Sequence, residues 1–339
     1  MHKSENSMEK LLTVVIPAYN AEKYIRRNLD ALLLSDEKMK MMEILVVDDG
    51  GKDATGVITK EYTSRYPSTF FFCHKENGGH GSVINYGIEH ATGKYFKVVD
   101  ADDWLNNDEL SDFLDMLQVH DEDLIASDYL CIEDETWKPL RKMGASADAS
   151  KYGKHGRLSD GFVDQVIKMH SLTIKTAILK EMPDRMDEHC FYVDAEYITY
   201  PIPYAETVFY DQRNLYMYRL GRNGQSMDIH SMQRNRGQHL RVMKSLTDFY
   251  SRLPELAPPK KHYIERCIAQ IVENQFQIDI SLGNHPDMRK ELRSWDRKLL
   301  KDYPEIYHST RRKSITLLRM TNYWILPIGY LVLRCVKRF

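Results

Sequence analysis

Four short apolar runs in the first third of the sequence are each followed directly by polar residues. The runs cover residues 12–16, 44–47, 70–73 and 95–99, and they are rich in β-branched and aromatic side chains. Stretches with the apolar spacing of a helix, at 21–34, 54–66 and 82–90, separate them. This alternation predicts an α/β fold with a mostly parallel sheet flanked by helices. Because the runs contain few polar residues, we expect helices to cover both faces of the sheet.

The polar residues after the runs are expected to meet at one edge of this sheet. In an open parallel sheet, ligands bind outside the carboxyl ends of the strands. The four ends supply, in order, Tyr19 and Asn20, Asp48 and Asp49, Asn77 and His80, and Asp100, Asp102 and Asp103. The sequence therefore predicts one binding site that is built from four strand ends.

The loop after the first strand argues against the common nucleotide cofactors. It reads Ala18-Tyr19-Asn20-Ala21, where a dinucleotide-binding or P-loop protein would carry a glycine-rich turn. The formal net charge of −2 is also unlike that of a protein that coats nucleic acid. We therefore expect neither a nicotinamide or flavin cofactor nor a nucleic-acid partner.

Asp100 and Asp102 form the most specific chemical pattern in the chain. Residues two apart in an extended segment point to the same side, so both carboxylates can face one ligand. Oxygen ligands of this kind suit Mg²⁺ or Mn²⁺ shared with phosphate groups. Aspartates after strands also satisfy backbone groups in turns, which is the simpler interpretation. The position after the fourth of four strands favours the metal.

Five short motifs, taken in order, resemble those of the family 2 glycosyltransferases, which have the GT-A fold. They begin at Thr13, Val46, Asn77, Ala91 and Asp100 and read TVVIPAYN, VVDDGGKD, NGG, ATGKY and DAD. Their order and spacing match over roughly residues 11–120. The resemblance implies an inverting enzyme that moves a sugar from a nucleotide-sugar donor to a hydroxyl group of a saccharide or lipid-linked acceptor. A role in cell-surface polysaccharide or glycolipid synthesis would follow.

The resemblance also implies roles for individual residues. Pro17, Ala18, Tyr19 and Asp48 would contact the base and ribose of the donor, and uridine diphosphate is the family's commonest nucleotide. Asp100 would lie near the ribose and the metal. A further ligand of the Mn²⁺ or Mg²⁺ cofactor would be Asp102, the last residue of the DAD motif.

The chain departs from the family pattern in the helix after the glycine pair. Many members carry Ala-Arg-Asn where this sequence has Val83, Ile84 and Asn85. An arginine partner of the diphosphate or of the DAD motif is therefore missing. His80, in the unusual Gly-His-Gly-Ser segment, is expected either near the donor or simply in solvent.

An inverting transfer needs a general base that takes the proton of the acceptor hydroxyl. The segment Phe-Tyr-Val-Asp-Ala-Glu-Tyr at 191–197 resembles the family's base motif and implies Asp194 as the base, with Glu196 as its rival. An aspartate here could instead cap a helix.

Arg222 lies in a later polar loop and is expected to bind the diphosphate, although a plain surface loop is nearly as good an interpretation. The QxxRW motif of processive synthases is absent, which favours transfer of one sugar.

The pattern changes from alternating strands and helices to helices alone near residue 229. We therefore predict a catalytic domain at 11–228 and a helical region at 229–339. An eleven-residue apolar run, YWILPIGYLVL, lies near the end between basic residues. It is too short to span a bilayer, so it suits either a buried helix or membrane association of residues 315–339.

Composition places the chain in a reducing compartment. Its 5 cysteines are scattered and form no CxxC pair, and the polar start of the sequence does not resemble a signal peptide. We expect a cytoplasmic protein with peripheral contact to the inner face of the membrane.

Two other functions compete: a nucleotidyltransferase of related fold, which would need a glycine-rich basic loop after the first strand, and an inactive nucleotide-sugar-binding scaffold. The polar, glycine-bearing segment 137–161 is expected to be a long loop or an insertion.

Overall fold

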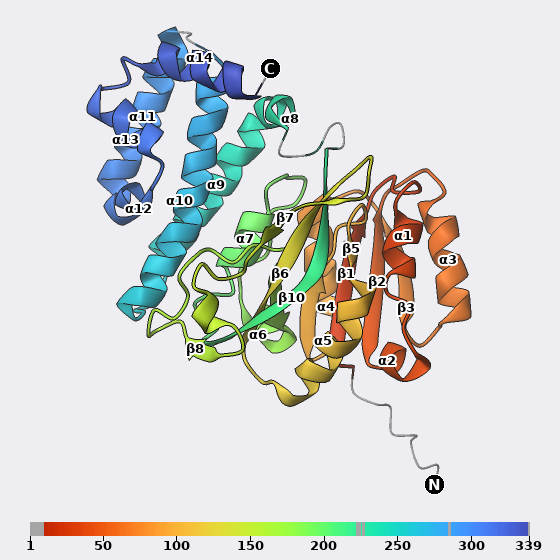
Figure 1. Ribbon diagram of the computed structural model, residues 1–339. Coiled ribbons are helices and arrows are strands. Elements are labelled where there is room, and N and C mark those ends of the chain that lie inside the picture. Colours follow the sequence, from red (N-terminus) through yellow and green to blue (C-terminus); the bar gives the residue numbers. More distant parts are fainter. Residues whose placement is uncertain (1–9, 222–224, 226–227, 284–285, 338–339) are drawn as a thin grey trace. The chain divides into compact units, whose positions relative to one another are not determined.

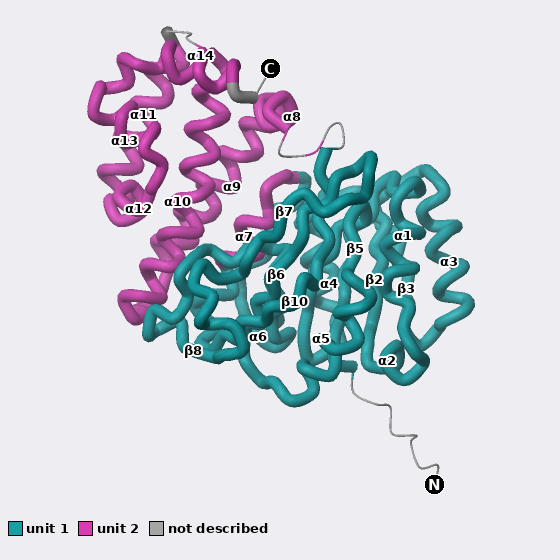
Figure 2. The backbone as a smooth tube through the Cα atoms, in the orientation of Figure 1, with its two compact units in different colours: residues 1–189, 200–222 teal, residues 190–199, 223–339 magenta. Residues whose placement is uncertain are grey.

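The computed structural model describes residues 10–221, 225, 228–283 and 286–337 (Figure 1). The chain divides into two compact units (Figure 2). The first contains Met1–His189 and Tyr200–Arg222, and the second contains Cys190–Thr199 and Asn223–Phe339. The predicted domain boundary at residues 228 and 229 stays a prediction.

A single sheet of ten strands forms the centre of the first unit. The strands are β1 (Leu12–Ala18), β2 (Met42–Asp49), β3 (Phe70–Lys75), β4 (Tyr95–Val98), β5 (Trp104–Leu105), β6 (Leu124–Glu133), β7 (Pro139–Met143), β8 (His155–Arg157), β9 (Leu172–Lys175) and β10 (Thr207–Leu220). Their order is β3-β2-β1-β4-β9-β6-β10-β5, with β7 paired to β6 and β8 paired to β10. The four strands that the apolar runs predict are confirmed and adjacent.

Most of the long strands run in one direction. The pairings of β2 with β3, β1 with β2, β1 with β4 and β6 with β10 are parallel. β9 runs antiparallel to both β4 and β6, so β6 and β10 point the same way as the first four strands. The predicted α/β class is confirmed. Of the two expectations for 137–161, the long loop is wrong, because β7 and β8 in this segment pair antiparallel with β6 and β10. The other expectation, an insertion, stays a prediction.

Helices cover both faces of the parallel strands, as the apolar runs predict. The helices of the first unit are α1 (Ile25–Asp30), α2 (Asp36–Lys40), α3 (Thr55–Arg65), α4 (His80–His90), α5 (Asn107–Val119) and α6 (Thr176–Glu181). Val14 of β1 joins a buried cluster with Leu29 of α1 and Phe113 of α5. Val15 points the other way, to α4, where a Cβ on Gly87 would lie 2.5 Å from it. Alternate residues of one strand therefore fill two cores.

The second unit is helical, as predicted for the C-terminal region. Its helices are α7 (Asp194–Thr199), α8 (Ile229–Arg234), α9 (Arg236–Ser251), α10 (Pro258–Ser281), α11 (Pro286–Asp302), α12 (Pro304–Ser309), α13 (Lys313–Met320) and α14 (Leu326–Lys337). α10 is the longest of these and contacts α9, α12 and α14, and it begins at Pro258, whose fixed φ suits the first turn of a helix. Among the described helices, none combines the length and apolar character needed to cross a membrane.

Candidate active site

The ends of β1 and β2 place the four residues predicted to contact the nucleotide. Pro17 and Ala18 close β1, and Ala18 pairs with Asp48 at the end of β2. Tyr19 follows β1 with 59% of its surface exposed, whereas Asp48 is buried. The structure therefore brings these residues together at one edge of the sheet and leaves an aromatic ring there in contact with solvent.

Asp48 is held by two groups of the first unit. Its Oδ1 accepts a hydrogen bond of 2.9 Å from the Gly51 backbone N–H, and its Oδ2 lies 2.9 Å from His74 Nδ1. These contacts fix the carboxylate while the His74 ring stays more than half exposed. Such a fixed acceptor at the end of a strand suits a ribose hydroxyl, because a hydroxyl can donate to it.

The neighbouring Asp49 shapes the turn that carries the glycine pair. Its carboxylate accepts backbone hydrogen bonds of 2.9 Å from Gly78 and 2.7 Å from Gly79, and it pairs with Lys75 Nζ at 2.9 Å. Gly79 has a φ of 83°, a conformation that favours glycine. One buried carboxylate thus fixes the start of α4 and, with it, the position of His80.

His80 reaches the DAD motif from the start of α4. Its Nε2 lies 2.8 Å from Oδ1 of Asp100, and both side chains are about one quarter exposed. The structure therefore favours the first of the two sequence-based interpretations of His80, a position beside the predicted donor site. A protonated imidazole here would place a positive charge next to the carboxylate pair, in a site that lacks the family's usual arginine.

Asp103, directly after the DAD motif, is the most deeply anchored acid of this edge. It is 2% exposed, accepts a 2.7 Å hydrogen bond from the Tyr216 hydroxyl and accepts a 2.8 Å bond from the Arg219 backbone N–H. Burial raises the pKa of Asp103 well above its ordinary value, and the negative charges of Asp102 and Asp100 add to the shift. The charged form of Asp103 is thus the one that this environment disfavours.

His170 is a residue of this site that sequence analysis missed. One side-chain ligand atom each from His170, Asp100 and Asp103 lies within 4.8 Å of the others. In the described part of the chain, the buried His170 Nδ1 makes no hydrogen bond. Burial lowers the pKa of His170 to about 4, so the imidazole is neutral and its nitrogen can bind a cation. No sequence signal marks His170, because it lies in a loop 70 residues after the motif.

A buried lysine positions the loop of His170. Lys97 of β4 donates hydrogen bonds of 2.9 Å to the His170 carbonyl and 3.2 Å to the Leu172 carbonyl. Burial lowers the pKa of Lys97 to about 7, despite the opposing charge of Asp211. The loop that carries His170 is therefore tied to the strand that carries the DAD motif.

The donor set fits a divalent cation. The cluster that the structure brings together is Asp100, Asp103 and His170, and Asp102 follows two residues after Asp100 on the chain. Carboxylate oxygens and an imidazole nitrogen are ligands that Mn²⁺ accepts, and Mg²⁺ prefers the oxygens alone. The buried His170 nitrogen without a hydrogen-bond partner is the observation that supports this fit. Asp103 belongs to the same cluster, and because it is 2% exposed and joins the turn to β10 through Tyr216 and Arg219, we assign it an anchoring role.

The two predicted base residues belong to the second unit. Asp194 begins α7 and is exposed, whereas Glu196 is fully buried. The loop before them is anchored to α9, because the Phe191 N–H donates a 2.8 Å bond to Gln238 Oε1. Tyr192 in this loop has a φ of 71°, which is rare for a bulky residue and common near functional sites. Arg222, predicted to bind the diphosphate, lies outside the described residues.

Comparison with known proteins decides the family. The sequence profile of Glycosyl transferase family 2 matches residues 13–180. An uncharacterized glycosyltransferase from Mycoplasma genitalium is 30% identical over 219 residues, which are 64% of this chain and 70% of that protein. The chain belongs to glycosyltransferase family 2. It is also 28% identical to the minor teichoic acid biosynthesis protein GgaB of Bacillus subtilis, over 34% of this glycosyltransferase but only 13% of GgaB.

Solved structures share the fold of this glycosyltransferase. Residues 1–349 of S. aureus TarS, in a complex with UDP-GlcNAc, superpose with a TM-score of 0.65 and 16% identity, covering 97% of this chain and 91% of that fragment. A mannosyltransferase from Pyrobaculum calidifontis, in a complex with GDP-Man and Mn²⁺, gives a TM-score of 0.51 and 15% identity, covering 94% and 88% of the two chains. The GT-A fold and the helical C-terminal region are confirmed by these likenesses.

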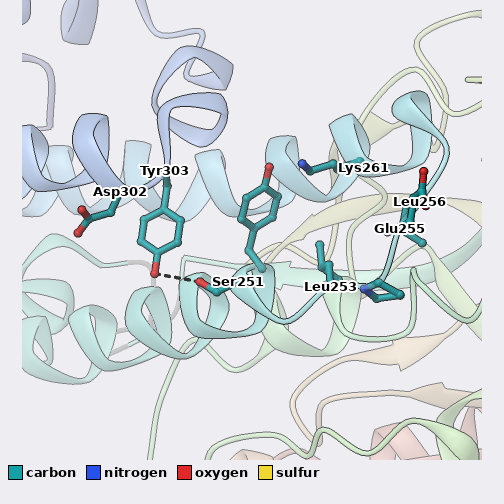
Figure 3. Close-up of a pocket in the computed structure, with 9 residues that line it drawn as sticks. Ser251, Leu253, Glu255, Leu256, Lys261, Asp302 and Tyr303 are labelled. Atoms are coloured by element: carbon teal, nitrogen blue, oxygen red, sulfur yellow. Dashed lines mark hydrogen bonds between the residues drawn. The ribbon is translucent and has the colours of Figure 1, made fainter.

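A pocket of about 410 Å³ in the second unit is a separate feature of this glycosyltransferase (Figure 3). Tyr250, Lys261 and Tyr303 are among its lining residues, and the Ser251 hydroxyl lies 3.2 Å from that of Tyr303. None of the predicted site residues lines it. We therefore assign the chemistry to the strand ends of the first unit rather than to this pocket.

Tyr216→Phe tests the anchoring of Asp103. Loss of the hydroxyl leaves a buried carboxyl with one hydrogen-bond donor fewer, and we expect the free energy of unfolding to fall by about 1–3 kcal/mol. Tyr210→Phe is the control, because it removes a buried hydroxyl from the same strand and leaves both Asp103 bonds intact. Urea unfolding measures both variants, and equal losses in the two would contradict the assignment.

Proposed function

We propose that this glycosyltransferase moves one sugar from a uridine diphosphate sugar to a hydroxyl group of a cell-surface polysaccharide or glycolipid acceptor, with inversion at the anomeric carbon. The main support is the cluster of Asp100, Asp103 and His170 after β4, with a buried His170 nitrogen that makes no hydrogen bond in the described part of the chain, and the position of Asp48 at the end of β2. The UDP-GlcNAc bound to TarS and the teichoic acid role in the name of GgaB support the donor and the acceptor class.

The nucleotide is proposed to bind along the ends of β1 and β2. Tyr19, which is largely exposed, would stack on the base, and the fixed carboxylate of Asp48 would accept a hydrogen bond from the ribose. Pro17 and Ala18 would contact the base through their backbone atoms, and their small side chains would leave space for the base. Arg222 is proposed to bind the diphosphate as a charge-assisted donor.

Asp100, Asp102 and His170 are the residues that would hold a Mn²⁺ or Mg²⁺ ion. A bound divalent cation would neutralise charge on the diphosphate and favour its departure. Without that cation, the two carboxylates would repel the donor's phosphates. His80 holds Asp100 from the side of α4 and fixes the orientation of its carboxylate.

Asp194 is proposed as the general base that takes the proton from the acceptor hydroxyl. Its exposure is the supporting observation, because a base must reach a substrate group directly or through one water. Glu196 on the same short helix is fully buried, which makes it the poorer candidate.

Asp102→Asn tests the metal site. We expect UDP together with Mn²⁺ to raise the melting temperature of the wild type. The same addition should not raise the melting temperature of Asp102→Asn, and UDP with excess chelator should not raise that of the wild type. Asp108→Asn is the control, an exposed aspartate in the first turn of α5. Thermal shift with and without Mn²⁺ is the measurement. A full response to UDP in excess chelator would refute the metal assignment.

Asp194→Asn tests the base. The change keeps the shape and removes the proton acceptor, so we expect turnover to fall by roughly 10²–10⁴-fold with little change in UDP affinity. Glu196→Gln is the matched comparison and should retain far more of the turnover. Release of UDP from UDP-sugars in the presence of acceptor, measured alongside UDP binding, separates the two effects. A wild-type turnover rate for Asp194→Asn would show that another residue is the general base.

Peripheral membrane contact is proposed for the C-terminal helices α13 and α14. Their inner side is packed, with Ile315, Leu318 and Leu326 buried. A second set of large apolar side chains on the same segment is exposed: Leu317, Met320, Trp324, Ile328, Leu331 and Val332. Exposed apolar residues next to basic ones are typical of helices that lie in the headgroup region of a membrane.

Leu331→Glu combined with Val332→Glu tests this contact. Both side chains are 57% exposed, so the substitutions should leave the melting temperature unchanged while reducing sedimentation with anionic vesicles about tenfold or more. Val57→Glu on α3 is the control, a residue that is 67% exposed on the first unit. Vesicle binding that is equally strong in all three proteins would contradict the proposal.

A further inference from the structure

An arginine of α1 lies against two tryptophans in the first unit. The Cζ atom of Arg27 is 4.3 Å from the ring centroid of Trp104 and 4.0 Å from that of Trp137. The two indole rings are themselves 5.7 Å apart and tilted by 52°. Arg27 is exposed and Trp137 is 40% exposed, so this group forms part of the surface. We call Arg27, Trp104 and Trp137 the arginine–tryptophan cluster.

The charge of Arg27 is not balanced by a carboxylate. In the described part of the chain, Arg27 forms no ion pair, and the charged group that acts on it is a second guanidinium. Partial burial and then the positive charge of Arg219 lower the pKa of Arg27. Arg219 lies 4.7 Å from the Trp137 ring and forms an ion pair with Asp134. Two guanidiniums therefore share one indole ring, and among the described residues only Arg219 has a carboxylate partner.

The cluster is built on the turn that carries the DAD motif. Trp104 follows Asp103 directly in the chain. Asn28, next to Arg27 on α1, donates hydrogen bonds of 3.0 Å to the Asp100 carbonyl and 2.9 Å to the Asp103 carbonyl. The same residues that fix the predicted metal-binding turn thus fix the position of the cluster.

The chemistry of the cluster suits an anion attached to a carbon skeleton. A guanidinium stacked on aromatic rings is held in one plane, and its N–H edge remains available for two parallel bonds to an oxyanion. The exposed indole surface next to it offers an apolar face to carbon-bound hydrogens. A small inorganic anion would bind only to the guanidinium edge, whereas an anionic saccharide or polyol would also contact the indole face.

We propose that the arginine–tryptophan cluster is an acceptor subsite that binds a phosphate or carboxylate group carried by a saccharide or polyol chain. This inference rests on the proposed function, because it assigns the acceptor class of the same site. The donor diphosphate would have its own positive partner in the divalent cation that Asp100 and Asp102 are proposed to hold. The unbalanced charge of Arg27 is therefore assigned to the second substrate, which makes the acceptor an anionic polymer or its precursor.

Tryptophan fluorescence tests the subsite directly, since two of the 4 tryptophans of the chain belong to it. We expect glycerol 3-phosphate to change the emission of the wild type, and an equal concentration of glycerol to leave it unchanged. Arg27→Gln should raise the concentration of glycerol 3-phosphate needed for this emission change at least tenfold. Arg27→Lys keeps the charge but loses the planar stack, so it should need a concentration between those of the wild type and Arg27→Gln. Arg26→Gln is the matched control, since Arg26 is exposed on the same helix and pairs with Glu61 at 2.9 Å.

A second titration, in saturating UDP and Mn²⁺, separates the two sources of phosphate. An acceptor subsite predicts that glycerol 3-phosphate still binds, and that Arg27→Gln leaves the UDP-dependent rise in melting temperature intact. Displacement of glycerol 3-phosphate by UDP, or a wild-type response in Arg27→Gln, would overturn the inference. The proposed function fails by a different readout, the absence of any response of the wild type to UDP and Mn²⁺.

Discussion

The buried carboxyl group of Asp103 connects the parts of the sheet on which the predicted active site depends. It follows the DAD motif on the chain, yet both of its donors, the Tyr216 hydroxyl and the Arg219 N–H, come from β10. Tyr216 also receives a 3.2 Å hydrogen bond from the Asp100 backbone N–H. The turn between β4 and β5 is thereby fixed in one conformation. Fixed ligands are what a metal site requires, because a cation binds best to groups that do not need reordering.

The acids at this edge have two different tasks. Asp49 and Asp103 are buried and accept hydrogen bonds from the protein itself, so they shape the two turns. Asp48, Asp100 and Asp102 lie beside them and are the residues proposed to meet the donor. The division follows from the hydrogen-bond partners rather than from burial, because Asp48 is as buried as Asp49. The donors to Asp49 belong to the glycine pair, and the donors to Asp103 belong to β10, so each of these acids joins two distant segments. Adjacent aspartates in a motif can therefore be assigned different roles from their hydrogen bonds.

Much of the first unit could be predicted from the sequence, because its signals are local. The runs that include Val14 and Val15 are apolar on both sides, and the structure places these residues in two separate cores. The short strands β7 and β8 could not be predicted, because most of their residues are exposed. Exposed strands at the edge of a sheet need no apolar pattern that would mark them in a sequence. The role of His80 also stayed open until the structure placed its ring beside Asp100.

The sequence by itself determined the order of the first four strands and the helices between them, the family, and the set of acids at those strand ends. These follow from periodicity and from motifs whose residues are close together on the chain. Only the tertiary structure decided that Asp103 is anchored from a residue 113 positions away, that His170 joins the acids, and that Arg27 stacks on Trp137. Each of these contacts joins distant segments. Their geometry depends on how the whole sheet packs, and no local pattern of residues encodes it.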